Sequence, residues 1–123
     1  VNDCSHSLCF REPTVPTAED IFDALRDVTD RAKRQGSRVY LGTIAPFGSV
    51  GDPWREQAEA LRQDYNRLIR NSHIADGIAD MDAALRDPDD VHRMQEGFHL
   101  GDGVHPNWLG GERMADVLMK TLL

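Results

Sequence analysis

The chain is poor in cysteine, in positive charge and in long apolar runs. Its 123 residues include only two cysteines, Cys4 and Cys9, which are too few for a disulfide-based scaffold. The 21 acidic residues outnumber the 14 basic ones, and the formal net charge is −7. This balance argues against a surface for nucleic acid or anionic lipid. No apolar run approaches the roughly 18 residues of a membrane span, so we predict neither a nucleic-acid partner nor a membrane span.

The amino-terminal segment leaves two interpretations of the cysteines open. Cys4 and Cys9 could close one small disulfide loop in an oxidising compartment, or they could be two separate thiols. Residues 1–16 show no sustained periodicity and contain two prolines, which predicts a loop. No signal peptide is visible, and the chain begins at Val1 rather than at methionine. We therefore expect Val1 to be a processing site or a cut in a longer chain.

What the sequence does contain is an alternation of helical and strand patterns. Three segments have apolar residues at helical spacing, namely residues 17–36, 52–72 and 107–122. The expected buried stripe of the first is Ile21, Leu25, Val28 and Ala32. That of the second is Trp54, Ala58, Leu61, Tyr65, Leu68 and Ile69. That of the third is Met114, Val117, Leu118 and Leu122. Gly110 and Gly111 near its start are expected to permit close packing.

Two short apolar segments, residues 38–44 and 77–81, are predicted to be parallel strands that are covered on both faces. Residues 82–85 suit one helical turn, and residues 86–101 form a long polar stretch typical of a functional loop. Alternating strands and helices predict an α/β fold with a parallel sheet. Two strands cannot make a stable sheet with two covered faces alone. We therefore expect residues 1–123 to be part of one larger domain, with further strands outside this chain.

One Asp-x-x-His pair has a setting that favours catalysis. Asp102 and His105 belong to the segment Asp-Gly-Val-His-Pro-Asn at residues 102–107, directly before the last predicted helix. Such loops gather at the ligand-binding edge of an open α/β sheet. A turn of this length can direct the carboxylate to one imidazole nitrogen, which leaves the other as a general base. The same segment also suits a plain turn with Asn107 as a helix cap, so both interpretations remain.

The other histidines predict no metal or cofactor. The pairs Asp89 with His92 and Glu96 with His99 have chelating spacing, but a solvated polar loop explains them more simply. A zinc site needs three or four convergent ligands, and the sequence contains no such cluster.

Residues 102–107 resemble the Asp-x-x-His-Pro block that closes the hydrolases of the SGNH/GDSL family. Residues 1–3, Val-Asn-Asp, resemble the end of that family's Gly-x-Asn-Asp block. Between the two blocks, residues 41–47 resemble a strand and loop of secreted bacterial members, and several further segments fit the same subgroup. These further segments lie around residues 65–66, 80–82 and 84–88. The resemblance thus extends over essentially the whole chain.

The resemblance implies a flavodoxin-like, three-layer α/β/α sandwich with a parallel sheet, of which this chain is the C-terminal portion without the N-terminal strands. It implies that His105 is the general base, that Asp102 orients it, and that the Asn2 side chain donates to the oxyanion. The alternative for Asn2 is an ordinary turn residue. The family's Gly-Asp-Ser block with the nucleophile does not occur in this sequence, and we nominate no substitute serine.

The resemblance also implies the partners. The expected substrate is a small ester, either a carbohydrate acetyl ester or a lipid acyl ester, and a secreted protein is implied. The serine would come from the N-terminal part of the same domain, so this chain alone is expected to be inactive. The alternative is a non-catalytic remnant of the fold that associates with a second copy of itself through an unfinished sheet edge.

Overall fold

The computed structural model describes residues 2–48 and 53–123, and it describes Asn2, Asp3, His6, Ser7 and Pro53 by their backbone alone. In chain order, the described elements are α1 (Asn2–Cys9), α2 (Ala18–Arg34), β1 (Tyr40–Gly42), α3 (Pro53–Asn71), β2 (Gly77–Ala79), α4 (Met81–Leu85), the 3-10 helix η1 (Glu96–Phe98) and α5 (Trp108–Leu122). The element types and their order follow the predicted alternation, with one additional helix at the start. The chain therefore has a mixed α/β fold.

The two strands pair in parallel, as predicted. Tyr40 lies opposite Gly77, and Gly42 lies opposite Ala79. The paired region is shorter than the predicted residues 38–44 and 77–81, and side chains add hydrogen bonds at both of its ends. The carboxylate of Asp76 accepts the backbone N–H of Val39 at 2.7 Å. Beyond Gly42, the hydroxyl of Thr43 accepts the backbone N–H of Asp82 at 2.9 Å, after α4 has begun.

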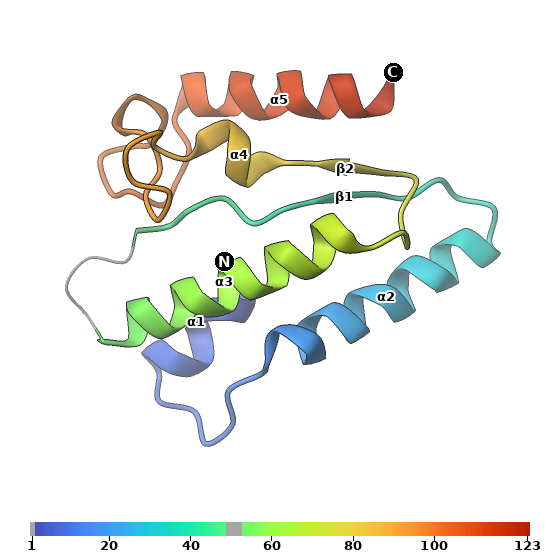
Figure 1. Cartoon of the computed structure of the whole chain (residues 1–123), viewed down its shortest axis with the longest axis horizontal. Helices are drawn as coiled ribbons and strands as arrows, with labels where there is room; N and C mark the ends of the chain where they lie inside the picture. Colours follow the sequence, from blue (N-terminus) through green and yellow to red (C-terminus); the bar gives the residue numbers. More distant parts are fainter. Residues whose placement is uncertain (1, 49–52) are drawn as a thin grey trace.

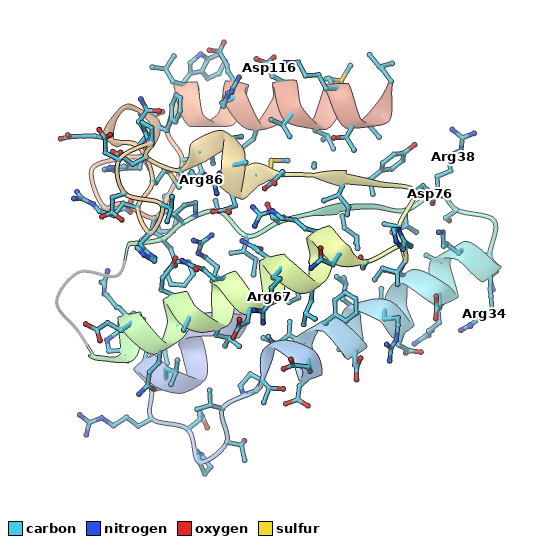
Figure 2. All side chains as sticks on the ribbon, viewed as in Figure 1. Arg34, Arg38, Arg67, Asp76, Arg86 and Asp116 are labelled. Atoms are coloured by element: carbon cyan, nitrogen blue, oxygen red, sulfur yellow. The ribbon has the colours of Figure 1, made fainter. Side chains whose placement is uncertain are left out.

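Helices lie on both sides of the two strands (Figure 1). Helices α2 and α3 pack against each other on one side, whereas α5 contacts β2 from the other. Arg38 and Asp76 lie beyond the amino ends of the strands, and Arg86 lies near their carboxyl ends, beside the loops that precede α5 (Figure 2). These loops carry Asp102 and His105, the two residues that the sequence analysis predicts to be catalytic.

The start of α2 has the predicted capping box. The hydroxyl of Thr17 accepts the backbone N–H of Asp20 at 3.1 Å, and the Asp20 carboxylate accepts the N–H of Thr17 at 2.9 Å. The helix ends before Gly36, whose positive φ of 82° a side chain would disfavour. The predicted apolar stripe was wrong at one position, because Val28 is 61% exposed and Thr29 is buried instead.

The core forms around α3 in two neighbouring clusters. In the first, Leu41 of β1 packs with Tyr65 and Ile69 of α3. In the second, Cys4 packs with Phe47 and Ala58. The predicted stripe of α3 is confirmed by the buried residues Ala58, Tyr65 and Ile69 and by the half-buried Trp54, Leu61 and Leu68. The predicted N-cap Asp52 lies outside the described residues.

The prediction of a loop at residues 1–16 was wrong for its first half. Residues 2–9 form α1, which packs against α3 through the buried Cys4 and the half-buried Leu8. The two apolar residues are four positions apart and therefore share one helix face. Cys4 is a buried free thiol and Cys9 an exposed one. Five residues of helix separate them by about 140° around the axis, so the disulfide interpretation was wrong.

Polar side chains of α3 form a buried ion network at the carboxyl ends of the strands. Arg62, which is 1% exposed, donates to both carboxylate oxygens of Glu59 at 2.6 Å and to Asp82 at 2.6 Å. Burial acts to lower the pKa of Arg62, but these hydrogen bonds outweigh it and raise the pKa. Asn66 donates to the carbonyl of Ile44 at 2.8 Å and accepts its N–H at 2.7 Å. The network fixes the chain just beyond β1.

Helix α5 has two different faces. Met114, Val117 and Thr121 are half-buried on the face toward β2. Leu118 and Leu122, which the sequence assigned to the inner face, are instead exposed. Together with Trp108 and Met119 they leave a row of exposed apolar side chains along the helix. Across the part of the chain that the structure describes, no helix is both long enough and apolar enough to cross a membrane.

Candidate active site

The segment from Phe98 to Asn107 folds back on itself before α5. Leu100 donates its backbone N–H to the carbonyl of His105 at 2.9 Å, and Asn107 donates to the carbonyl of Phe98 at 2.9 Å. Positive φ angles of 99° at Gly101 and 72° at Gly103 allow the tight return. The segment therefore presents residues 102–105 on a closed, hydrogen-bonded turn.

Asn107 joins this turn to α5. Its side-chain oxygen accepts the N–H of Gly110 at 3.0 Å, which makes it the N-cap that the sequence predicts. Its amide donates to the carbonyls of Gly97 at 3.0 Å and His99 at 3.1 Å. One side chain thus pairs with a backbone N–H group at the start of the helix and with two backbone carbonyl groups at the start of the turn.

The predicted contact between Asp102 and His105 is present. The Nδ1 atom of His105 lies 2.7 Å from Oδ2 of Asp102. The other carboxylate oxygen accepts the backbone N–H groups of Val104 and His105, each at 2.9 Å. The N–H of His105, its imidazole and the N–H of Val104 hold the pKa of Asp102 well below its usual range. The carboxylate is thus a fixed anion that favours a proton on Nδ1 and leaves Nε2 as the basic nitrogen.

The imidazole of His105 lines a pocket of about 430 Å³. Phe47, Trp54, Val104 and Pro106 make most of its wall apolar, and Ser5 of α1 contributes one hydroxyl group. The His105 side chain is 71% exposed and that of Asp102 is 46% exposed. Both groups of the dyad are therefore accessible, and the histidine adjoins a volume that suits a small apolar group.

His99 is a structural part of this site that sequence reasoning missed. Its Nδ1 atom accepts the backbone N–H groups of Gly101 at 2.9 Å and Gly103 at 3.1 Å. A nitrogen that accepts two hydrogen bonds carries no proton, so the ring of His99 is the Nε2–H tautomer. In the sequence, the two glycines that flank Asp102 are the signal for this role of His99, because a tight turn leaves backbone N–H groups that need acceptors.

Among the candidate side chains that the structure describes, His92 lies apart from the dyad. The Asn2 side chain, to which the resemblance assigns the oxyanion, lies outside the described residues, as does that of His6. His92 contacts Glu59 at 3.2 Å and Gln63 at 2.8 Å, beside the buried ion network. Among the residues that the structure describes, no group of three or more His, Cys, Asp or Glu side chains could hold a metal ion.

The comparisons with known proteins assign no family to this chain. No model of a known protein family matches the chain, and no curated protein matches it. The resemblance to the SGNH/GDSL hydrolases therefore rests on the motif residues of the sequence alone.

Proposed function

We propose that this chain supplies the general base, its orienting carboxylate and an oxyanion donor to a serine ester hydrolase of the SGNH/GDSL type. The observation that carries the proposal is the 2.7 Å contact between His105 Nδ1 and Asp102 Oδ2, on a turn whose histidine lines an apolar pocket. A neutral imidazole that donates through Nδ1 can accept a hydroxyl proton at Nε2. The pocket of about 430 Å³ is large enough for a short acyl group.

In the proposed reaction, a serine hydroxyl gives its proton to Nε2 of His105 while its oxygen forms a bond to the ester carbonyl carbon. The Asn2 amide donates to the resulting oxyanion. The carbon–oxygen bond of the alcohol then breaks, and the alcohol takes the proton from His105. Water attacks the acyl-serine through the same base, which releases the acid and restores the serine. The nucleophile is supplied by a Gly-Asp-Ser segment that belongs to the N-terminal part of the same domain.

The packing of α5 supports a partner segment of this kind. Trp108, Leu118, Met119 and Leu122 expose apolar surface in a row on one helix. Single exposed apolar residues are ordinary, but several on one side of a helix favour contact with another element. Helices on both sides of two strands are also what one half of a three-layer α/β/α sandwich would contain. Additional strands beside β1 would complete the proposed parallel sheet.

The same exposed row supports a second candidate, a non-catalytic chain that associates with its own copy. Sedimentation and intact mass of the purified protein separate the two candidates. A lone, homogeneous chain that forms stable oligomers and gains nothing from a Gly-Asp-Ser segment would favour the second.

The direct test combines this chain with the segment encoded upstream of Val1. The assay measures hydrolysis of a short-chain activated ester by the chain, by the segment and by their mixture. We expect turnover only in the mixture, together with a higher melting temperature, because a partner that binds only the folded state stabilises it. Replacing the serine of Gly-Asp-Ser by alanine in the segment should abolish turnover but keep the thermal shift. Serine-inhibitor-sensitive turnover by the 123-residue chain alone would overturn the proposal.

A further inference from the structure

A second recess lies next to the dyad, at the Asp102 end of the same turn. It has a volume of about 220 Å³, and its lining includes Arg55, Arg93, Met94, His99, Asp102 and Gly103. We call it the arginine recess. Arg55 also lines the apolar pocket beside His105, so the two spaces share a wall. The guanidinium of Arg55 lies over the ring of Trp54, with 5.0 Å between Cζ and the ring centroid, and this stacking holds it at the junction.

The charge of the arginine recess is opposite to that of the whole chain. Its lining carries two guanidinium groups and one carboxylate, whereas the chain has a formal net charge of −7. The carboxylate of Asp102 already accepts hydrogen bonds from Val104, His105 and the His105 imidazole, so its oxygens are largely engaged within the turn. Because the Asp102 oxygens are engaged in this way, the Arg93 guanidinium is the group in the lining that favours an anion over a cation.

The backbone of Arg93 is fixed by hydrogen bonds and by its buried neighbour. Its N–H donates to the carbonyl of Asp90 at 3.0 Å, and its carbonyl accepts the N–H of Asp87 at 2.8 Å. The next residue, Met94, is 3% exposed and forms an isolated antiparallel bridge with Arg86. Among the described residues, the Arg93 guanidinium makes no ion pair, which leaves its planar set of donors available to a ligand.

His99 also lines the recess. Its Nδ1 atom accepts the N–H groups of Gly101 and Gly103, which fixes the ring and places its proton on Nε2. The recess therefore combines the Arg93 guanidinium with a turn whose backbone is fixed by hydrogen bonds. Arginine recognises planar carboxylates and phosphates through paired hydrogen bonds.

We propose that the arginine recess binds an anionic group of the substrate, a carboxylate or a phosphate that lies close to the scissile ester. This inference rests on the proposed function, because it places the reacting carbonyl beside His105. The apolar pocket receives the acyl chain and the recess receives the charged group. The two spaces together have a size that is typical of a small-molecule site. The substrate class is then an anionic ester rather than a neutral acetyl or lipid ester.

The first experiment measures binding and needs no nucleophile. The ¹⁵N-labelled chain is titrated with acetate and, separately, with inorganic phosphate at constant ionic strength. We expect saturable shifts of the Gly101 and Gly103 amides and of the Arg93 side-chain N–H. Arg93→Gln should weaken the binding at least fivefold, and Arg93→Lys should keep part of it. Arg67→Gln, which removes an exposed arginine of α3, should bind like the unchanged chain (Figure 2).

The two ligands distinguish the two chemical sources, because the tighter one identifies the charged group. Absence of saturation with both ligands, or equal binding by Arg93→Gln, would overturn the proposal.

The second experiment uses the enzyme assembled with its Gly-Asp-Ser segment. It compares kcat/KM for an activated ester of succinate, which carries a free carboxylate, with that for the corresponding neutral butyrate ester. We expect Arg93→Gln to lower the succinate-to-butyrate ratio at least fivefold while turnover of the butyrate ester persists. An unchanged ratio in Arg93→Gln overturns the recess proposal and leaves the hydrolase intact. Failure of both esters together with retained anion binding would instead overturn the proposed function.

Discussion

Gly110 lies so close to the carbonyl oxygen of Phe98 that a Cβ atom at this position would overlap the oxygen and crowd the ring of Pro106. Both neighbours belong to the turn that carries Asp102 and His105. Gly111, the next residue of α5, would place a Cβ within 4 Å of nothing. The expectation that both glycines permit close packing was therefore right for Gly110 and wrong for Gly111. Sequence alone could not separate the two because adjacent helix residues face different directions.

This difference predicts opposite effects for two otherwise identical substitutions. Gly110→Ala should lower the free energy of unfolding by about 1–3 kcal/mol, because the turn must move to admit the methyl group. Gly111→Ala should be neutral or raise it by up to about 1 kcal/mol, because alanine is the better helix former. Urea unfolding measures both. Amide shifts confined to residues 98–107 in Gly110→Ala would locate the strain, whereas equal stability of the two variants would contradict the packing.

The buried ion network makes a prediction about stability. Arg62→Met should cost about 3–5 kcal/mol, because it leaves Glu59 and Asp82 buried without their principal cation. Arg67→Met removes a similar i,i+3 pair with Asp64, but both side chains are more than half exposed. This control should change the free energy of unfolding by about 0.5 kcal/mol or less. Similar denaturation midpoints for the two variants would show that burial does not set the strength of these pairs.

The loss of folding stability at acidic pH should depend on Asp80. Burial acts to raise the pKa of this carboxyl, but hydrogen bonds from Arg70, Ala83 and Thr43 lower it to about 2, from an ordinary value of 3.8. A carboxyl whose folded pKa is the lower one stabilises the fold fully above pH 3.8 and loses this contribution as the pH falls towards 2. Asp80→Asn should therefore be less stable at pH 7 but show a flatter loss of stability below pH 4. Chemical denaturation at several pH values tests this, and an unchanged slope would contradict it.

How much of the structure could be predicted from the sequence depends on how far apart the interacting residues lie in the chain. Local signals were reliable, since the Thr17 capping box, the Asn107 cap and the Asp102–His105 contact all involve partners three residues apart. The apolar patterns correctly predicted α3 and the parallel strands. They also predicted that Val28 is buried, whereas the structure buries Thr29 instead. Contacts between distant segments could not be predicted. Nothing in the local sequence indicates that Arg62 is buried with Asp82, which lies 20 residues further along the chain.

Helix α1 is a second case in which contacts between distant segments could not be predicted. Eight residues with little intrinsic preference for a helix become helical because Cys4 and Leu8 pack against α3. The arginine recess likewise combines residues from α3, from the polar loop and from the turn before α5. Neither Arg55 nor Arg93 belongs to a recognisable motif, so only the fold brings them together.

The dyad itself makes a prediction that does not need a nucleophilic serine. In the unchanged chain, at a pH where the imidazole is neutral, the Asp102 carboxylate should hold the proton of His105 on Nδ1. Asp102→Asn keeps an oxygen that can accept the N–H groups of Val104 and His105, so the turn should survive. The carboxamide holds Nδ1–H less strongly, and the population should shift towards the Nε2–H tautomer. Long-range ¹H–¹⁵N correlation spectra of the imidazole measure this shift.

The kinetic consequence follows from the tautomer. A proton on Nε2 blocks the nitrogen that must accept the serine proton, so Asp102→Asn should lower kcat of the assembled enzyme by about 10⁴-fold, with a similar loss in His105→Ala. His73→Ala, an exposed histidine between α3 and β2, should retain normal turnover. Asp116→Asn on the exposed side of α5 removes the same charge as Asp102→Asn and controls for it (Figure 2). Turnover by Asp102→Asn within tenfold of the unchanged enzyme, with His105 still protonated on Nδ1, would remove Asp102 from the mechanism and leave it as a turn residue.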